Sequence, residues 1–222
     1  MKRFWIILSV VVVGLIAAFI FTKPESDNSA AFTGNATEVQ ADEHIRNGTD
    51  KKVTLIEYGD FQCPSCASYY TILKSLEERY EDQVSFGFRH YPIISIHPNA
   101  FSAARAAEAA AKQGKFFEMH DKLYENQTAW GQISTNQQSL FENYAKELGL
   151  NIDQFKKDYI SEEIANRINR DVSSAKQFDI TGTPSFILNG KKIENPTDKA
   201  EFEEVLNKAI EDAGGTPPKT IE

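Results

Sequence analysis

The chain has 222 residues and a net charge of −8, with an isoelectric point near 5.1. This length fits one domain with additional segments, and the excess of acidic residues argues against a nucleic-acid partner, whose phosphates need clustered Lys and Arg. The chain has only two cysteines, Cys63 and Cys66, which excludes a scaffold held together by many disulfide bridges.

The N-terminal segment contains a long apolar run. Lys2 and Arg3 precede 18 residues without a charge, from Phe4 to Phe21. A transmembrane helix needs about 20 apolar residues, whereas a cleaved signal peptide usually has an apolar part of about 7–15 residues and a small-x-small cleavage site, which is not evident here. Basic residues that precede a span stay in the cytoplasm. The sequence therefore predicts a membrane anchor at residues 1–22, with a signal peptide as the alternative, and an extracytoplasmic domain.

Two further segments have the composition of flexible chain. Residues 23–41 are rich in Ser, Asn, Ala, Thr and Asp and contain few large apolar residues, which indicates a flexible linker. Residues 214–222 begin with two glycines and contain two prolines, so we expect a disordered tail. The folded domain is therefore expected at residues 42–213, on a linker that lets it move above the membrane.

The first part of this domain has the pattern of a β-α-β unit. Residues 53–58 form a β-branched and aromatic run that is ended by Gly59, which is typical of a buried strand. Apolar residues then recur at helical spacing from Cys63 to Tyr80. Residues 84–91 alternate in character, which predicts a second strand.

The rest of the domain combines helices with a hairpin. Residues from about 98 to 178 contain apolar stripes at helical spacing and no convincing strand, which predicts an all-helical insertion. An Asn-Gly pair between residues 183–188 and 191–193 indicates a β-hairpin. A last helix is expected at 198–213, capped by Asp198. The sequence therefore predicts an α/β fold with a central sheet of four or five strands.

Cys63 and Cys66 lie directly after the first strand, at the start of the next helix. Unpaired N–H groups at a helix N-terminus stabilise an anion, so we expect a lowered pKa for Cys63, which would be the attacking thiolate. Cys66 lies one turn further along the helix and should be less exposed. The spacing also allows a disulfide between the two residues. The pattern therefore predicts a pair that cycles between dithiol and disulfide.

A zinc site is the alternative use of a Cys-x-x-Cys pair, but such a site needs about four ligands. The chain has four histidines without ligand spacing: His44, His90, His97 and His120. A covalently attached haem is excluded because Ala67, and not His, follows Cys66. We therefore predict a redox pair, with no metal and no cofactor.

These elements resemble the thioredoxin superfamily and, within it, the exported DsbA-like thiol–disulfide oxidoreductases. The resemblance covers about residues 42–212. It rests on a strand that ends in Phe61-Gln62-Cys63-Pro64-Ser65-Cys66, on the helical insertion, and on Thr181-Gly182-Thr183-Pro184-Ser185-Phe186 before the hairpin and last helix. It implies a thioredoxin-like fold, with Pro64 and Ser65 as the inner residues of the active-site motif. Strongly oxidising members have His in place of Ser65, so the oxidising strength stays open.

The resemblance also implies roles outside the motif. The proline that matches Pro184 is cis in the family and leaves the N–H and C=O of Thr183 free to bind an extended substrate chain. A trans proline that opens an edge strand is the alternative. Glu57 lies on the same side of its strand as Leu55, where a carboxylate is costly unless it has a use. It matches the buried acid that exchanges a proton with the second cysteine, and burial would raise its pKa; a solvated strand residue is the alternative.

The sequence therefore predicts an extracytoplasmic oxidoreductase that introduces disulfide bonds, with Cys63, Cys66 and Glu57 as catalytic residues and Thr183 and Pro184 as substrate-binding residues. The expected partners are unfolded exported proteins with free cysteines. The resemblance also implies a quinone-linked membrane protein of the DsbB or vitamin K epoxide reductase kind as the recycling partner. Two alternatives remain: a reductase or isomerase that uses the same residues, and a non-catalytic chaperone whose cysteines form a permanent bridge.

Overall fold

The computed structural model describes residues 34–219 and contains a five-stranded mixed sheet. The strands follow the order β1-β3-β2-β4-β5 across the sheet. Their bounds are His44–Arg46 for β1, Val53–Gly59 for β2, Val84–His90 for β3, Ser185–Leu188 for β4 and Lys191–Ile193 for β5. Only the central pair, β2 and β3, is parallel, and the other three pairs are antiparallel. A thioredoxin-like α/β sheet within the predicted range of strand number is thereby confirmed.

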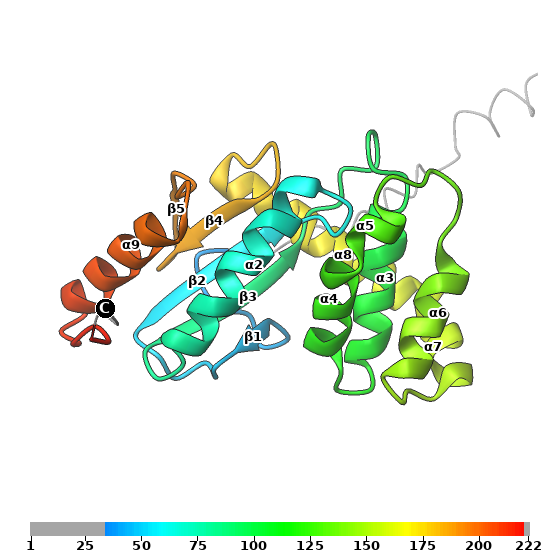
Figure 1. Cartoon of the computed structure of the whole chain (residues 1–222), viewed down its shortest axis with the longest axis horizontal. Helices are drawn as coiled ribbons and strands as arrows, with labels where there is room; N and C mark the ends of the chain where they lie inside the picture. Colours follow the sequence, from blue (N-terminus) through cyan, green and yellow to red (C-terminus); the bar gives the residue numbers. More distant parts are fainter. Residues whose placement is uncertain (1–33, 220–222) are drawn as a thin grey trace, which may run out of the picture.

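One face of the sheet is covered by α2, Pro64–Arg79, and α9, Lys199–Asp212 (Figure 1). Leu76 of α2 and Phe202 of α9 share one buried cluster with the apolar side chains of β2, β3 and β4. The last helix begins after its predicted cap, because the Asp198 carboxylate accepts a hydrogen bond of 2.9 Å from the backbone N–H of Glu201. These two helices pack against the parallel strands and so position the C-terminal end of β2. The cysteine motif follows directly after this strand.

Helices alone connect β3 to β4, as predicted, and they lie beside the sheet in Figure 1. They are α3 at Ala100–Ala111, α4 at Phe116–Glu125, α5 at Gln127–Trp130, α6 at Gln138–Glu147, α7 at Ile152–Tyr159, α8 at Glu162–Ser174 and the 3-10 helix η1 at Ala175–Phe178. Alanines on α3 let the neighbouring helices approach closely, and Trp130 and Phe141 fill the space between them without exposure. This cluster also contains Phe61 and both cysteines, so the insertion forms one wall of the motif.

The opposite face of the sheet is covered by η1 and by the segment at residues 34–41. Ala36 is fully buried in a cluster with residues of β2, β4 and η1. Its carbonyl accepts a hydrogen bond of 2.7 Å from Arg89 Nη1, and the same guanidinium forms a buried ion pair with Glu43. The folded region therefore extends to residue 34 at least, before the predicted boundary at residue 42, because this stretch supplies partners for a buried charge.

The predicted membrane anchor at residues 1–22 lies outside the described residues. Within residues 34–219, no helix combines the length and the apolar character of a membrane span. The predicted tail is described as far as residue 219, and its Lys219 carbonyl accepts a hydrogen bond of 3.1 Å from Arg79 Nη2. This part of the tail therefore lies against the end of α2.

Candidate active site

Cys63 forms the cap of α2 and Cys66 lies in its first turn, so the helix begins within the motif as predicted. Pro64 occupies the start of the helix, where its missing N–H is not needed. The Cys63 backbone N–H donates to the Asp60 carbonyl at 3.0 Å, which folds the chain sharply between the end of β2 and the helix. Pro64 and Ser65 are exposed, Cys63 is 8% exposed and Cys66 is fully buried. An incoming sulfur can therefore reach Cys63 and not Cys66.

The two thiols have opposite acidities. The pKa of Cys63 is lowered from 9.0 to about 5, because its sulfur accepts a hydrogen bond from the Cys66 thiol and others from the N–H groups of Cys66 and Ser65, while burial opposes the shift. Burial raises the pKa of the Cys66 thiol well above 9.0, and the hydrogen bond that this thiol shares with Cys63 raises it further. Cys63 is therefore a thiolate at neutral pH, whereas Cys66 keeps its proton.

Thr183 and Pro184 lie beside this thiolate, although 120 residues separate Thr183 from Cys63 along the chain. The peptide bond between Thr183 and Pro184 is cis, as the resemblance implied. The Cys63 sulfur lies 3.6 Å from the Thr183 carbonyl oxygen. Residues 181–185 and 192–195 line an open depression of about 600 Å³ next to this contact. A chain that binds in this depression would reach Cys63.

Glu57 lies beneath Cys66, buried to 5% exposure. Burial, the neighbouring Glu77 and the Cys63 charge raise the pKa of Glu57 from 4.5 to about 8, and a hydrogen bond with the Cys66 thiol opposes the shift. Its Oε1 has no hydrogen-bond partner among the residues that the structure describes. A protonated carboxyl group in contact with the buried thiol has the position and acidity of a proton donor.

Two glutamines hold the cysteine motif in place, and sequence reasoning assigned no role to either. Gln127, on α5, donates from Nε2 to the carbonyls of Phe61 and Cys63, both at 2.8 Å. Gln62 donates to the Gly131 carbonyl at 2.9 Å. Gln127 comes from a polar part of the insertion with no recognisable motif, and only the packing of α5 against the cysteine motif identifies its role.

Asp60 forms a second set of contacts around the same turn. One of its carboxylate oxygens accepts a hydrogen bond of 2.8 Å from the backbone N–H of Gln62. The other accepts from the N–H of Ile93 at 2.9 Å and lies 2.7 Å from His97 Nδ1. Asp60 is 1% exposed, so these partners compensate for the burial of its charge.

Two of the histidines that look scattered in the sequence meet at Glu108, on α3. His44 Nε2 and His90 Nε2 lie 2.7 and 2.9 Å from the same Glu108 oxygen. Within residues 34–219 this is the one group of three side chains whose donor atoms are close enough for a metal ion. However, Arg167 Nε lies 3.9 Å from that oxygen. The positive guanidinium group already interacts with the Glu108 carboxylate, and a metal ion would have to compete with it. The cluster fits a structural hydrogen-bond network better than a metal site.

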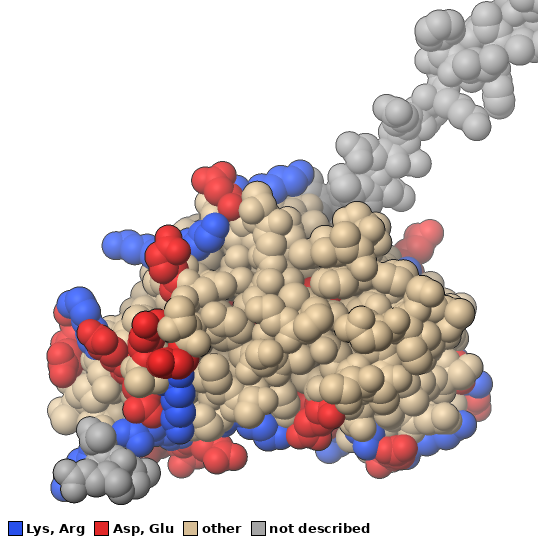
Figure 2. All heavy atoms as spheres, turned by 45° about the horizontal axis from the view of Figure 1, so that its top comes forward, with Lys and Arg blue, Asp and Glu red and all other residues tan. Residues whose placement is uncertain are grey.

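The surface around the motif is weakly charged. The end of the molecule at which α2 begins is uppermost in Figure 1 and is turned forward in Figure 2, where Lys, Arg, Asp and Glu lie mainly toward the edges. Ile94 and Ile96 are 65% and 67% exposed, and Ile96 and Ile133 line a hollow of about 320 Å³ next to Pro64. Such a surface suits contact with apolar segments of a protein chain.

The comparisons with known proteins agree with this geometry. A family profile described as Thioredoxin matches residues 40–208. Oxidised BdbD from Bacillus subtilis has 26% identity and a TM-score of 0.64, over 75% of this chain and 92% of that one. Alpha-DsbA1 from Wolbachia pipientis has 21% identity and a TM-score of 0.71, over 82% of this chain and 98% of that one.

Curated relatives match the same region within longer proteins. A protein named Na(+)/H(+) antiporter NhaA 1, from Mycobacterium sp. (strain KMS), is 35% identical over 164 residues, which are 72% of this chain and 25% of the relative. A protein named Na(+)/H(+) antiporter NhaA, from Herminiimonas arsenicoxydans, is 34% identical over 74% of this chain and 25% of its own length. The chain thus spans about a quarter of the length of these relatives.

Proposed function

Because the chain belongs to the thioredoxin family, as a DsbA-like thiol–disulfide oxidoreductase, we propose that it introduces disulfide bonds into exported proteins through Cys63 and Cys66. The observation that carries the proposal is the position of Cys63 at the start of α2, where the Cys66 thiol and backbone N–H groups donate hydrogen bonds to its sulfur and lower its pKa to about 5. A thiol of low pKa is a good leaving group, and a stabilised thiolate favours the reduced form of the enzyme. The first effect speeds the release of Cys63 from a mixed disulfide, and the second favours oxidation of the substrate thiols by the disulfide form of this chain.

The reaction begins with the disulfide form of the enzyme. A substrate thiolate attacks Cys63 Sγ, the bond between Cys63 and Cys66 breaks, and the Cys66 sulfur leaves with the electron pair. Glu57 gives its proton to this buried sulfur, which the low polarity of the site would otherwise leave as a costly anion. The product of this step is a mixed disulfide between Cys63 and the substrate.

A second substrate thiolate then attacks the substrate sulfur of the mixed disulfide. The substrate disulfide forms and Cys63 leaves as a thiolate that needs no proton at neutral pH. Two substrate thiols have been oxidised and one enzyme disulfide has been reduced. Thr183 and Pro184 would hold the substrate chain next to Cys63, since their depression lies beside its sulfur.

Recycling requires an acceptor for the two electrons. We assign this step to a quinone-linked membrane protein of the DsbB or vitamin K epoxide reductase kind, as the resemblance implies. An anchor at residues 1–22 would place the domain outside the cytoplasm and keep it at high local concentration near that partner. The apolar surface beside Pro64 offers a place for either partner to bind.

Two measurements test the proposal. Equilibration with glutathione should give a reduction potential near that of strong oxidants, roughly −120 mV, whereas a value near roughly −270 mV would identify a reductase. In cells, Cys66→Ala should accumulate mixed disulfides with exported proteins, because the resolving thiol is absent. The matched control is the Cys63→Ala, Cys66→Ala double variant, which should trap nothing. A bridge that glutathione does not reduce, together with no trapping, would leave only the non-catalytic alternative.

A further inference from the structure

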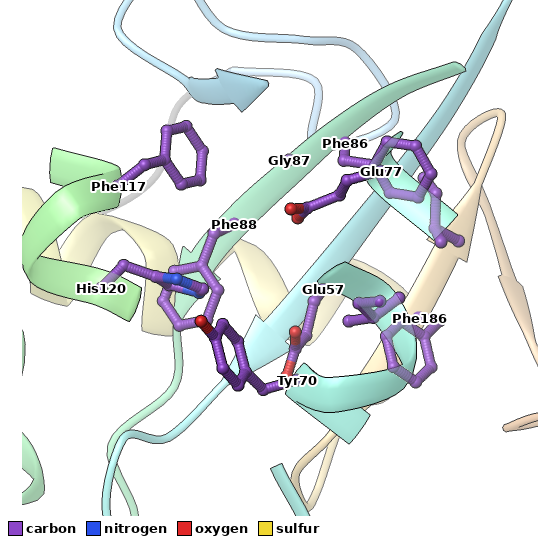
Figure 3. A pocket seen from close by; sticks show the side chains of 11 residues that line it. Glu57, Tyr70, Glu77, Phe86, Gly87, Phe88, Phe117, His120 and Phe186 are labelled. Carbon is purple, nitrogen blue, oxygen red and sulfur yellow. The ribbon is translucent and has the colours of Figure 1, made fainter. Parts of the chain in front are cut away.

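A small cavity lies beneath the cysteine pair, between α2, β2, β3 and α4 (Figure 3). Its volume is about 20 Å³, and a site of about 10–15 Å³ is enough for one water molecule when polar groups line it. Leu55, Phe86 and Phe88 form apolar walls, while Glu57 and Glu77 supply carboxyl groups. Figure 3 shows both side chains at this cavity, Glu57 from β2 with its carboxyl group turned toward Tyr70, and Glu77 from α2. The cavity therefore has room for a water molecule, and two acids line it.

The two acids differ in their access to solvent. Glu57 is 5% exposed and its Oε1 has no hydrogen-bond partner among the described residues. The Glu77 side chain is 16% exposed, and its Oε2 lies 3.2 Å from Nε of Arg46, which is 23% exposed. A proton that leaves or reaches Glu57 must cross the protein interior, and Glu77 is the acid that connects this interior to the surface.

The other titratable groups of the cavity wall are poorly suited to this task. Burial lowers the pKa of His120 from 6.5 to about 4, so the ring is neutral at neutral pH. Burial also raises the pKa of Tyr70 well above its ordinary value, so the phenol keeps its proton. Burial raises the pKa of Glu77 from 4.5 to about 7, against the nearby charge of Arg46. Of these three groups, Glu77 alone exchanges a proton readily near neutral pH.

We propose that Glu77 is the outer station of a proton pathway that links solvent to Cys66 through a water molecule in the cavity and Glu57. The inference rests on the proposed function, because it supplies the proton that the release of Cys66 consumes. The transfers are coupled in one step: protonated Glu57 gives its proton to the leaving Cys66 sulfur while the water gives a proton to Glu57 and takes one from Glu77. Glu77 then regains its proton from bulk solvent. One proton moves inward and no electron is transferred by the pathway.

Charged groups from three elements face Glu77 and set the pH at which it acts. Arg46 belongs to β1, Lys74 and Glu78 belong to α2, and Asp121 belongs to α4. Arg46 and Lys74 favour the carboxylate, whereas Asp121 and Glu78 favour the protonated acid. Glu78 is exposed and does not line the cavity, so it offers a matched control on the same helix.

The test compares Glu77→Gln with Glu78→Gln in the full chain. The disulfide form is reduced by dithiothreitol in single-turnover experiments that are followed by tryptophan fluorescence, and each variant rate is divided by the wild-type rate at the same pH. The ionisation of dithiothreitol affects both rates equally at a given pH, so its effect cancels in this ratio. Below about pH 7, where Glu77 holds a proton, we expect Glu77→Gln to be slower by roughly tenfold or more. Above about pH 8 wild type has lost that proton too, and the ratio should approach one.

Three results would overturn the pathway: a flat ratio for Glu77→Gln, the same pH dependence in Glu78→Gln, or no recovery in Glu77→Asp. Glu77→Asp restores a carboxyl group, so its reduction rate should show the same pH dependence as the wild-type rate. It therefore also tests the pathway if Glu77→Gln does not fold. The pKa of Cys63, measured by alkylation, should be unchanged in all of them. Failure of the pathway would leave the reduction potential and the trapping by Cys66→Ala intact, whereas failure of the proposed function would alter those two measurements first.

Discussion

Replacing the buried acid by its neutral isostere, Glu57→Gln, should change how the stability of the reduced protein depends on pH. Glu57 keeps its proton in the folded protein up to about pH 8, while its ordinary value in an unfolded chain is 4.5. Between these values the unfolded chain has lost the proton and the folded protein has not. The contribution of Glu57 to the free energy of unfolding is therefore fully present below about pH 4.5 and is lost as the pH rises through 8.

The size of this loss follows from the two pKa values. At about 1.4 kcal/mol for each tenfold change, the interval from 4.5 to about 8 corresponds to about 5 kcal/mol in total, of which about 3 kcal/mol is lost by pH 7. A glutamine has no proton to lose in this range. Relative to wild type, Glu57→Gln should therefore gain about 5 kcal/mol of stability as the pH rises from about 4 to about 9.

Urea unfolding of both reduced proteins across this pH range measures the difference directly. Cys63 contributes with the opposite sign, because its lowered pKa adds stability as the pH rises from about 5 to 9; both proteins keep Cys63, so this part cancels in the difference. Exposed Glu194 supplies a control, and Glu194→Gln should follow wild type at every pH. Parallel curves for Glu57→Gln and wild type would show that the acid is not held protonated by the fold.

Three further outcomes are expected. Alkylation of Cys63 in reduced Cys66→Ala should follow an ionisation below the free-cysteine value of about 8.5, although loss of the Cys66 hydrogen bond moves its midpoint above the wild-type value of about 5; equal midpoints in wild type and variant would contradict the assigned cause. Arg89→Leu leaves Glu43 buried without its ion-pair partner and should cost about 3–5 kcal/mol in urea unfolding; a loss under about 1 kcal/mol would show that water solvates the carboxylate. A chain that starts at residue 42 should melt below one that starts at residue 34, since Arg89 loses its backbone acceptors, and equal melting temperatures would contradict this.

The elements that could be predicted from the sequence are those that depend on local residue patterns. The strand before the motif, the helix that starts within it and the helix capped by Asp198 all depend on spacing over a few residues. Cys63 and Cys66 are close in the chain, so their place at the start of the helix could be predicted as well. The neighbourhood of Thr183 was accessible only through resemblance, because no local pattern brings together residues that are 120 positions apart.

Strand β1 and the segment at residues 34–41 have no such pattern. His44–Arg46 is a short, half-buried strand whose formation depends on antiparallel pairing with β3. Arg89, in β3, is a charged residue in a buried strand, and it is 1% exposed because Glu43, Ala36 and Glu38 enclose its guanidinium. Burial of this charge becomes predictable only when its partners are known, and two of them, Ala36 and Glu38, lie in the stretch whose composition indicates a linker.

The helical insertion does more than cover the site, because it is hydrogen-bonded to the backbone that carries the cysteines. Gln127 binds the carbonyls on both sides of Gln62, and Gln62 binds the insertion in return through the Gly131 carbonyl and the Asn99 N–H. Motion of α5 relative to the sheet would break these bonds and expose buried polar groups, which is costly. The motif is therefore held from two sides, by β2 before it and by the insertion beside it. A lowered pKa at Cys63 depends on N–H groups that stay aimed at the sulfur, so the rigidity of the insertion contributes to the acidity of the thiol as directly as the first turn of α2 does.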